Sequence, residues 1–394
     1  MKNEENKRVR VGVIGAGNIG SAHVAAIYGG KVPHMHLTCI CDINAEKRAS
    51  LQEKYPDIPI FDSDEAMFDA HLCDAVILSV PHFGHAPLAV AAFEKGYHVL
   101  TEKPGSVTAS GVRTMTEAWR KSGKKFGVMF NQRTNPLFAE CKSIMQAGEI
   151  GELRRMVWII TNWFRKDAYY ASGAWRASWT GEGGGVLMNQ APHNLDLWQW
   201  ICGMPDTVRA DCPCGKFHDL EVEDEATVYG TYPNGATAVF ITTTGDYPGT
   251  NRLEINGTKG KIVVESNRLK LTTATYDVRD FVGMPADAKN PVTVTEIPGE
   301  KYEGHANILE NFARHILFGE ELIAPGEDAL NEVLLCNAAY LSAWTGKEVS
   351  FPMDEQLFDE MLAEKQKNSR RQIAGRTSGN EGENGYLDRW NTVW

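Results

Sequence analysis

The sequence predicts two folded domains: an α/β domain with a parallel sheet, then an α+β domain with an open, mainly antiparallel sheet. Two observations support this fold class. Up to residue 130, short apolar runs alternate with helical segments, the order expected of right-handed βαβ units. After residue 150, strand patterns follow one another and are separated by turn signals. The length of 394 residues suits two domains at about 150 residues each.

The first domain is predicted to be built on buried parallel strands. Short, mostly apolar and β-branched runs predict strands at residues 9–14, 37–41, 75–80, 98–101 and 126–130. The segments between them predict helices at residues 21–28, 44–55, 87–95 and 108–121. In such a sheet, ligands bind beyond the carboxyl ends of the strands.

The second domain is predicted to begin its sheet with a long strand at residues 154–163. Between residues 208 and 273, Pro233-Asn234-Gly235 and Asn256-Gly257 are hairpin signals. Amphipathic helices are expected near residues 306–318 and 327–344. The expected organisation is a nucleotide domain at 1–130, a substrate and oligomerisation domain at 131–363, and a polar linker with an aromatic tail at 364–394. Whether that tail docks on a neighbouring subunit or ends free stays open.

Composition narrows the class of partner. There are 40 basic and 51 acidic residues, and the net charge of −11 disfavours nucleic acid and anionic lipid as partners. The longest apolar stretches, 75–81 and 333–341, are much shorter than a membrane span of about 20 residues. Residues 1–10 are polar and show no secretory signal, and eight cysteines neither form a disulfide scaffold nor complete a metal site. We therefore expect a cytoplasmic protein.

The strongest motif lies directly after the first strand. The segment Gly15-Ala16-Gly17-Asn18-Ile19-Gly20 opens a helix, as a dinucleotide-binding fingerprint requires. The first glycine allows a tight turn, the second lets the backbone approach the pyrophosphate, and the third lets helix and strand pack closely. Asp42 ends the second strand, where a carboxylate accepts from the adenosine ribose. These features predict a Rossmann domain.

Asp42 also bears on the choice of cofactor. Its carboxylate repels a 2′-phosphate, and Ile43 supplies no compensating cation, so NAD is favoured. Lys47 and Arg48 lie one helical turn further on and keep NADP open as the less favoured cofactor.

An ordered set of further motifs carries a family resemblance. Ser79-Val80-Pro81, His85 and Glu102-Lys103-Pro104 are followed by Phe130-Asn131-Gln132-Arg133, by Gly183–Gly185 with His193–Asp196, and by Leu253–Gly260. Over residues 9–355 this order resembles the Gfo/Idh/MocA family of glucose–fructose oxidoreductases and inositol dehydrogenases. The resemblance implies a nucleotide domain followed by an open sheet, whose exposed face makes a homodimer or homotetramer.

The resemblance also implies a set of cofactor-binding residues. The residues expected to contact NAD are Gly15, Gly17, Asn18, Ile19, Gly20, Asp42, Ser79, Pro81, His82, His85, Glu102, Lys103 and Asn131. By the same resemblance, Lys103 contacts both the substrate hydroxyl and the nicotinamide ribose.

Oxidation of an alcohol needs a group that takes the hydroxyl proton and a group that stabilises the developing alkoxide. Lys103 is the expected electrostatic partner, and His193 matches the family's histidine and is the expected base, since an imidazole exchanges protons near neutral pH. Many members carry Asp where this chain has Asn189, which cannot act as a base but can donate to a substrate hydroxyl. Lys103 and His193 remain the expected catalytic pair.

The chain has ten tryptophans, and a group of them precedes the glycine-rich turn. Aromatic rings stack on the C–H faces of sugars, so an aromatic platform predicts a carbohydrate ligand. Trp158, Trp198 and Trp200 are expected in the core instead. The expected substrate-binding residues are Lys103, Arg133, Trp163, Trp175, Arg176, Asn189, His193 and His305.

These expectations favour an NAD-dependent oxidoreductase that removes hydride from a secondary ring hydroxyl of a sugar, polyol or glycoside, with C3 of a pyranoside as one candidate. Two alternatives stay open. Some family members resemble NAD-assisted glycosidases, which oxidise the sugar transiently. Others resemble sensors that bind nucleotide and sugar without turnover, although retention of Lys103 and His193 argues against a sensor.

Overall fold

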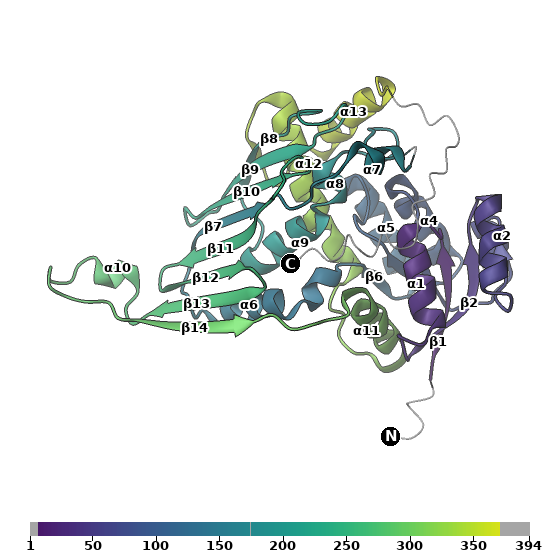
Figure 1. Cartoon of the computed structure of the whole chain (residues 1–394), viewed down its shortest axis with the longest axis horizontal. Helices are drawn as coiled ribbons and strands as arrows, with labels where there is room; N and C mark the ends of the chain where they lie inside the picture. The colour runs from purple at the N-terminus through teal and green to yellow at the C-terminus, as the bar shows by residue number, and fades with distance from the viewer. Residues whose placement is uncertain (1–6, 174, 371–394) are drawn as a thin grey trace. The chain divides into compact units, whose positions relative to one another are not determined.

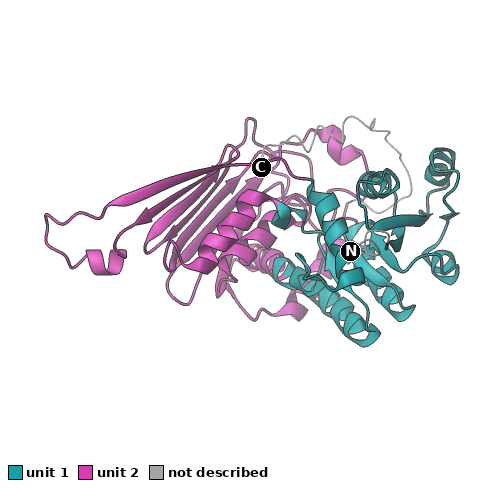
Figure 2. Ribbon diagram, turned by 90° about the horizontal axis from the view of Figure 1, so that it is seen from below, with its two compact units in different colours: residues 1–134, 303–333 teal, residues 135–302, 334–394 magenta. Residues whose placement is uncertain are grey.

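The computed structural model describes residues 7–173 and 175–370 of the chain. The chain divides into two compact units, shown in different colours in Figure 2. Unit 1 comprises Met1–Thr134 and Glu303–Val333, and unit 2 comprises Asn135–Tyr302 and Leu334–Trp394. The expected tail at Tyr386–Trp394 lies outside the described residues.

Unit 1 is built on a parallel sheet of six strands within the described part of the chain. The strand order is β3-β2-β1-β4-β5-β6, which is the order of a Rossmann fold. β1 and β4 are completely apolar on both faces except for Arg10, as expected of strands covered by helices on both sides. The bounds are β1 Val9–Ile14, β2 Met35–Cys41, β3 Ile60–Phe61, β4 Ala75–Leu78, β5 His98–Thr101 and β6 Phe126–Val128.

The helices of unit 1 follow the strands in alternation, as predicted, and Figure 1 labels α1, α2, α4 and α5 among them. Several begin with a side-chain cap: Asn44 accepts from Lys47 N, and Thr108 accepts from Gly111 N. Their bounds are α1 Asn18–Tyr28, α2 Ala45–Lys54, α3 Asp64–Asp69, α4 His85–Glu94 and α5 Ala109–Ser122, with short 3₁₀ turns η1 at His82–Gly84 and η2 at Asn131–Thr134.

Unit 1 is completed by a segment from much later in the sequence. Helix α11 (Gly304–Phe318) leads to η3 (Gly326–Asp328), and α12 (Ala329–Thr345) starts in this unit and continues into unit 2. Val128 N donates to Ala324 O at 3.1 Å, so this segment adds backbone hydrogen bonds at the β6 edge of the sheet. Phe312 of α11 is buried against Gly127 of β6.

Unit 2 is built on a nine-stranded sheet, counted over the described residues, in the order β14-β13-β12-β11-β7-β10-β9-β8-β15. All neighbouring pairs are antiparallel except β7 with β10, which is parallel. The predicted turn at Pro233–Gly235 joins β9 to β10. The bounds are β7 Leu153–Ile160, β8 Thr207–Asp211, β9 Glu225–Thr231, β10 Thr237–Thr243, β11 Asn251–Gly257, β12 Gly260–Glu265, β13 Arg268–Ala274, β14 Val292–Pro298 and β15 Val349–Ser350.

One face of this sheet is covered by the helices of unit 2. The ring of Trp158 on β7 lies 5.6 Å from Phe138 of α6, and Trp198 of α9 lies 6.2 Å from Phe240 on β10. Trp158 and Trp198 are therefore core residues, as expected. The remaining helices of the unit are α6 Pro136–Ala147, α7 Asp167–Ala171, α8 Val186–Asn189, α9 Pro192–Cys202, α10 Val278–Phe281 and α13 Glu355–Lys367.

Within the described residues, every helix is too short or too polar to cross a lipid bilayer.

Candidate active site

The glycine-rich turn of unit 1 has the geometry that its three glycines predict. Gly15 has a φ of +86°, which favours glycine, and its amide donates to Cys41 O at 2.8 Å. A Cβ on Gly20 would lie 1.9 Å from the Gly15 carbonyl oxygen, so only glycine fits there. A Cβ on Gly17 would meet nothing within 4 Å, so this backbone faces open space. Asn18 and Ile19 follow it as the first residues of α1.

Asp42 holds this turn from the end of β2. Its Oδ2 accepts from Ala16 N at 2.8 Å, and its Oδ1 accepts from Asn44 N at 2.8 Å. Arg48 uses its guanidinium to donate to the Asp42 carbonyl oxygen at 3.0 Å. The side chain of Ile43 is 88% exposed beside them. The carboxylate expected to contact the adenosine ribose thus also fixes the turn that is expected to face the pyrophosphate.

The end of β4 contributes Ser79, Pro81, His82 and His85. The Ser79 hydroxyl is buried and has no hydrogen-bond partner among the described residues. His82 is buried in η1, directly after Pro81. His85 is fully buried with Nδ1 2.7 Å from Pro104 O and Nε2 2.9 Å from Val80 O, and burial lowers its pKa. His85 therefore ties the ends of β4 and β5 together.

A buried polar cluster lies at the end of β5. Glu102 Oε1 contacts His23 Nε2 at 2.8 Å, and Glu102 Oε2 accepts from Lys103 N at 3.2 Å. Burial alone raises the pKa of Glu102, but the hydrogen bond from His23 and nearby positive charge lower it to about 2. Lys103 itself is half-buried. The site thus pairs an ionised carboxylate with the backbone of the expected catalytic lysine.

His305, at the start of α11, extends this cluster. Its ring centroid lies 5.7 Å from that of His23, and its Nδ1 is 3.3 Å from the Asn131 amide nitrogen. Burial, together with positive charge on His23 and Lys103, lowers the pKa of His305 to about 4. His305 is therefore neutral at physiological pH and accepts from Asn131.

The residues of unit 1 fit a dinucleotide. The backbone at Gly17 faces open space that a cofactor could occupy. The buried Ser79 hydroxyl and the buried Asn131 Oδ1 have no hydrogen-bond partner among the described residues, and a bound cofactor would supply one. The acidic Asp42 suits a ribose with a free 2′-hydroxyl.

Arg133 is engaged within unit 1. It is buried, and its Nη1 donates to Asp328 Oδ2 at 2.6 Å and to Ile323 O at 3.1 Å. Its guanidinium also lies 5.2 Å from the Phe130 ring. These contacts hold the segment before α12 to η2.

In unit 2, the glycine-rich turn Gly183–Gly185 is anchored by a buried carboxylate. Gly185 N and Leu187 N both donate to Glu223, at 2.9 Å each, and Tyr340 OH donates to it at 2.7 Å. Desolvation raises the pKa of Glu223 to about 7, although these donors act in the opposite direction. Glu223 thereby fixes the start of α8, which carries Asn189 at its end.

His193 lies in the first turn of α9, after Pro192 at the first helical position. It is buried, as is every residue from Pro192 to Gln199. Asn194 is completely buried, and neither of its side-chain polar atoms has a hydrogen-bond partner among the described residues. The expected base is thus held rigidly at the start of a buried helix.

The aromatic loop, which we define as residues 162–182, precedes that turn. Tyr169 OH receives hydrogen bonds from Arg176 Nη1 at 2.7 Å and from Asn189 Nδ2 at 3.1 Å. The second N–H of Asn189 donates to Glu182 Oε1. Trp163 is buried, whereas Trp175 and Arg176 are half-buried. The structure therefore brings Arg176 and Asn189 together and commits both N–H groups of Asn189 to protein partners.

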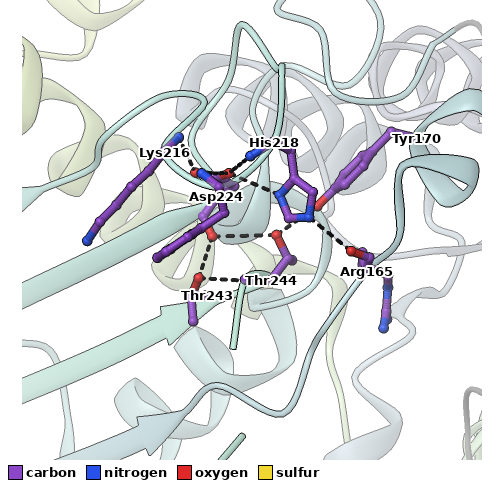
Figure 3. A network of polar contacts seen from close by, with 9 residues as sticks. Arg165, Tyr170, Lys216, His218, Asp224, Thr243 and Thr244 are labelled. Carbon is purple, nitrogen blue, oxygen red and sulfur yellow. Dashed lines mark hydrogen bonds and ion pairs between the residues drawn. The ribbon is translucent and has the colours of Figure 1, made fainter. Parts of the chain in front are cut away.

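A network around Asp224 supports this loop, and Figure 3 shows it. Asp224 Oδ2 accepts from Phe217 N at 2.8 Å and from His218 N at 2.9 Å. His218 Nε2 lies 2.9 Å from the Arg165 carbonyl oxygen, which only accepts, so Nε2 carries a proton. Tyr170 OH donates to Thr244 Oγ1 at 2.7 Å. The loop is thus fastened at Arg165 and at Tyr170.

Sequence reasoning missed three charged or titratable residues of these sites: His23, Glu182 and Glu223. His23 follows the glycine fingerprint by three residues, and this spacing on α1 was the available signal. Glu182 precedes the glycine-rich turn, but nothing in its sequence context marked it as buried. Glu223 lies two residues before β9 and 38 residues after Gly185, so no local pattern links it to the turn.

Two family descriptions match the chain. "Oxidoreductase family, NAD-binding Rossmann fold" (GFO_IDH_MocA) matches residues 9–130, and "GFO/IDH/MocA C-terminal domain" matches residues 138–263. These matches agree with the two sheets and with the glycine turn.

Two relatives and one solved structure are similar to this chain in sequence or in fold. Inositol 2-dehydrogenase of Rhizobium meliloti is 26% identical over 352 residues, which cover 87% of this chain and 99% of that protein. D-glucoside 3-dehydrogenase of Escherichia coli is 27% identical, over 57% of this chain and 66% of that protein. The WlbA dehydrogenase of Bordetella pertussis, solved in complex with NADH and UDP-GlcNAcA, has a TM-score of 0.75 at 24% identity and covers 88% of this chain and 100% of that one. The chain therefore belongs to the Gfo/Idh/MocA oxidoreductase family, with an NAD-binding Rossmann fold and the family's C-terminal domain.

Proposed function

We propose that the protein is an NAD-dependent dehydrogenase that oxidises a secondary ring hydroxyl of a sugar, polyol or glycoside. The observation that carries the proposal is the glycine turn open at Gly17, with Lys103 at the carboxyl end of β5 in the same unit. Relatives named inositol 2-dehydrogenase and D-glucoside 3-dehydrogenase support this class of reaction, and the second supports C3 of a pyranoside as a candidate position.

Unit 1 supplies the cofactor site. Gly15, Gly17 and Gly20 present the backbone and the start of α1 to the pyrophosphate, and Asp42 accepts from the ribose. Ser79 and Asn131 supply the buried polar atoms that face the cofactor. When bound there, NAD would supply the acceptor for the hydride that leaves the carbinol carbon.

Lys103 supplies positive charge near the substrate oxygen. A cation at this position stabilises the alkoxide that develops as the hydroxyl loses its proton. Glu102 holds the Lys103 amide, and His23 holds Glu102, so the lysine projects from a fixed backbone. His305 and Asn131, which are hydrogen-bonded to each other, are proposed to contact the ligand beside it.

His193 takes the hydroxyl proton in this proposal. Pro192 and the glycine-rich turn fix the start of α9, which holds the imidazole in one place. Trp163, Trp175 and Arg176 form a platform for the sugar ring in this proposal, and Arg176 and Asn189 both donate to Tyr169. Arg133 pairs with Asp328 and is proposed to affect the substrate site only indirectly, by holding the segment before α12 in place.

Replacement of either proposed catalytic residue tests the function. Lys103→Ala and His193→Ala are each expected to lose most turnover while retaining NAD binding, because neither residue forms the glycine turn. Dissociation constants for NADH and rates of NADH formation measure the two effects separately. Near-normal turnover in both variants would refute the proposed roles.

The choice of NAD over NADP has its own test. The Asp42 carboxylate repels a 2′-phosphate, and Arg48 is directed to the Asp42 carbonyl oxygen. NADH is therefore expected to bind more tightly than NADPH in a direct titration. Tighter binding of NADPH would overturn the choice.

A further inference from the structure

Unit 2 buries polar side-chain atoms that have no hydrogen-bond partner among residues 7–173 and 175–370. Asn194 in α9 and Thr242 in β10 are completely buried, and neither the Asn194 amide nor the Thr242 hydroxyl is paired within those ranges. The Oδ1 of Asn162, just after β7, is also buried and unpaired there. Buried polar groups are almost always hydrogen-bonded, so these exceptions need an explanation.

The contacts at its two ends show that α9 runs antiparallel to β10. Gly203, directly after α9, accepts through its carbonyl oxygen from Tyr232 OH at 3.2 Å, and Tyr232 lies in the turn that precedes β10. At its other end, α9 follows α8, whose start is held by Glu223. The next residue, Asp224, accepts through its carbonyl oxygen from Thr243 Oγ1 at the end of β10, at 2.8 Å (Figure 3). The start of α9 therefore lies toward the end of β10.

One ring contact sets the register between α9 and β10. The Trp198 ring lies 6.2 Å from the Phe240 ring. Asn194 precedes Trp198 by about one helical turn of 5.4 Å, and Thr242 follows Phe240 by two strand residues, about 6.6 Å, on the same buried face. Because helix and strand run in opposite directions, these two steps point the same way. The register therefore brings Asn194 and Thr242 to the same part of the layer between α9 and the sheet.

Asn162 adds an acceptor at the same end of the sheet. β7 and β10 are parallel, and Thr242 pairs with Ile160. Asn162 lies two residues after Ile160 and continues its row of buried side chains on the face that the helices cover. Arg165 N donates to Thr244 O at 3.0 Å, which holds the segment after β7 against the end of β10. The unpaired atoms of Asn194, Thr242 and Asn162 thus converge at the carboxyl ends of this parallel pair.

The chemistry of these side chains indicates the group that would satisfy them. The Asn194 amide supplies an acceptor and two N–H donors, the Thr242 hydroxyl both donates and accepts, and Asn162 Oδ1 only accepts. All three side chains are neutral. An alcohol hydroxyl both donates and accepts, so it matches this set better than a carboxylate, which only accepts. His193 and Trp163, the chain neighbours of Asn194 and Asn162, belong to the proposed substrate site.

We propose that Asn194, Thr242 and Asn162 line a subsite that binds a hydroxyl group of the substrate other than the one that is oxidised. The inference rests on the proposed function and assigns the choice among sugars and polyols to buried side chains of α9, of β10 and of the segment after β7. A ligand that lacks this hydroxyl leaves buried polar groups unpaired, so the site rejects it more strongly than a solvated contact would.

Binding measurements with matched ligands test the subsite without turnover. Calorimetric titrations in the presence of NADH use D-glucose, methyl β-D-glucopyranoside and myo-inositol, and then the monodeoxy derivatives of whichever binds most tightly. The proteins are the wild type, Asn194→Leu and Thr242→Val, since these replacements keep the shape of the side chain and remove its polar atoms. Each variant is expected to bind the parent ligand roughly 10- to 100-fold more weakly.

One monodeoxy derivative is expected to identify the hydroxyl that enters the subsite. It should bind the wild type more weakly than the parent ligand does, by a factor similar to that caused by Asn194→Leu. It should lose little further affinity in Asn194→Leu, because its partner group is already absent. The other monodeoxy derivatives should lose affinity in this variant as the parent ligand does.

Thermal denaturation of the ligand-free proteins separates ligand binding from a structural role. The matched control is Thr243, the next residue on β10, whose hydroxyl is also buried but donates to Asp224 O. Thr243→Val is expected to lower the midpoint of denaturation by about 2–4 °C, because it removes a hydrogen bond. Asn194→Leu and Thr242→Val are expected to leave the midpoint unchanged or to raise it, because no protein group loses a partner.

Weaker ligand binding without loss of stability supports the inference. A fall in the midpoint like that of Thr243→Val overturns it, because the side chains would then hold structural water. Unchanged affinity in both variants, losses that add in every monodeoxy derivative, or no binding of any of the three parent ligands also overturn it. Binding that depends on Asn194 and Thr242 but never yields NADH with NAD would refute the proposed function and leave the subsite standing.

Discussion

At the scale of single residues, one buried hydrogen bond supports the proposed catalytic lysine. Glu102 is almost completely buried and keeps its charge because His23 donates to it. Because the pKa of Glu102 is lowered in the folded protein, the interaction stabilises the fold fully at pH values above the ordinary glutamate pKa of 4.5. This contribution is lost as the pH falls through about 2.

His23→Ala is therefore expected to destabilise the protein by about 3–5 kcal/mol at neutral pH, because it leaves a buried carboxylate without its partner. The double variant His23→Ala/Glu102→Gln is expected to lose less than the sum of the two single variants. Denaturant titration of the four proteins measures the coupling. Additive losses would show that the two side chains do not depend on each other.

Substitutions at Gly17 and Gly20 are expected to separate an effect on folding from an effect on cofactor binding. Gly20→Ala would place a Cβ 1.9 Å from the Gly15 carbonyl oxygen, so it is expected to cost more than about 2 kcal/mol of stability. Gly17→Ala meets no protein atom and is expected to leave stability within about 0.5 kcal/mol while weakening NADH binding at least tenfold. Unchanged NADH affinity in Gly17→Ala would contradict the assigned cofactor site.

Sequence reasoning succeeded where a residue's role follows from its local context. The tight turn at Gly15 and the close packing at Gly20 were predicted because the fingerprint depends on neighbours in the chain, whereas the hydrogen bond from Ala16 N to Asp42 was not. His23 and Glu182 were not, because their partners are 79 and 7 residues away and burial is not visible in the sequence. The Asn189 amide was predicted to donate to a substrate hydroxyl, whereas the structure commits its N–H groups to Tyr169 and Glu182.

At the scale of elements, the glycine-rich turn and α8 depend on Glu223. Desolvation raises its pKa from 4.5 to about 7 in the folded protein. The folded state therefore holds this proton more tightly than the unfolded state, and the resulting stability is lost as pH rises from about 4.5 to 7. The loss is about 3 kcal/mol at most.

Glu223→Gln removes this titration and keeps an acceptor for Gly185 N and Leu187 N. The difference in unfolding free energy between the variant and the wild type is expected to change with pH between 4.5 and 7 and to be constant above pH 8. Denaturant titrations at a series of pH values measure it. A difference that is independent of pH across this range would show that Glu223 titrates normally.

Boundaries of elements were less predictable than their existence. β1 and β5 begin and end where their apolar runs do, because both faces of these strands are buried. Asn256-Gly257, predicted as a turn, instead ends β11, and Thr258-Lys259 make the connection to β12. Pairing with β7 extends β11 through these residues, and no local signal reveals that pairing.

At the scale of the whole molecule, Glu303–Val333 return to unit 1 between β14 and β15 of the second sheet. This return brings His305 to Asn131 and His23, which no local pattern predicts. We still propose a nucleotide domain and a substrate domain. In this proposal Glu303–Val333 belong to the nucleotide domain, although they lie far from the rest of it in the sequence.

The face of the second sheet that lies opposite α6 and α9 supports the proposal of a homo-oligomer. Val157, Val239 and Tyr229 are neighbours in register on β7, β10 and β9, and all three are partly exposed. Such an apolar row on an open sheet is typical of an interface. We expect a dimer or tetramer by light scattering, and Val239→Glu is expected to lower the assembled fraction at least tenfold. A monomeric wild-type protein would refute this proposal.

The central claim is that the protein transfers hydride from a secondary hydroxyl of a sugar, polyol or glycoside to NAD and then releases both products. The most direct measurement follows absorbance of NADH during reaction with a panel of neutral and acidic sugars, inositols and glycosides, with product analysis alongside. The account predicts that NADH accumulates in equal amount with one keto product, and that Lys103→Ala abolishes this. Cleavage of a glycoside without net NADH, or NAD binding with no turnover across the panel, would contradict it.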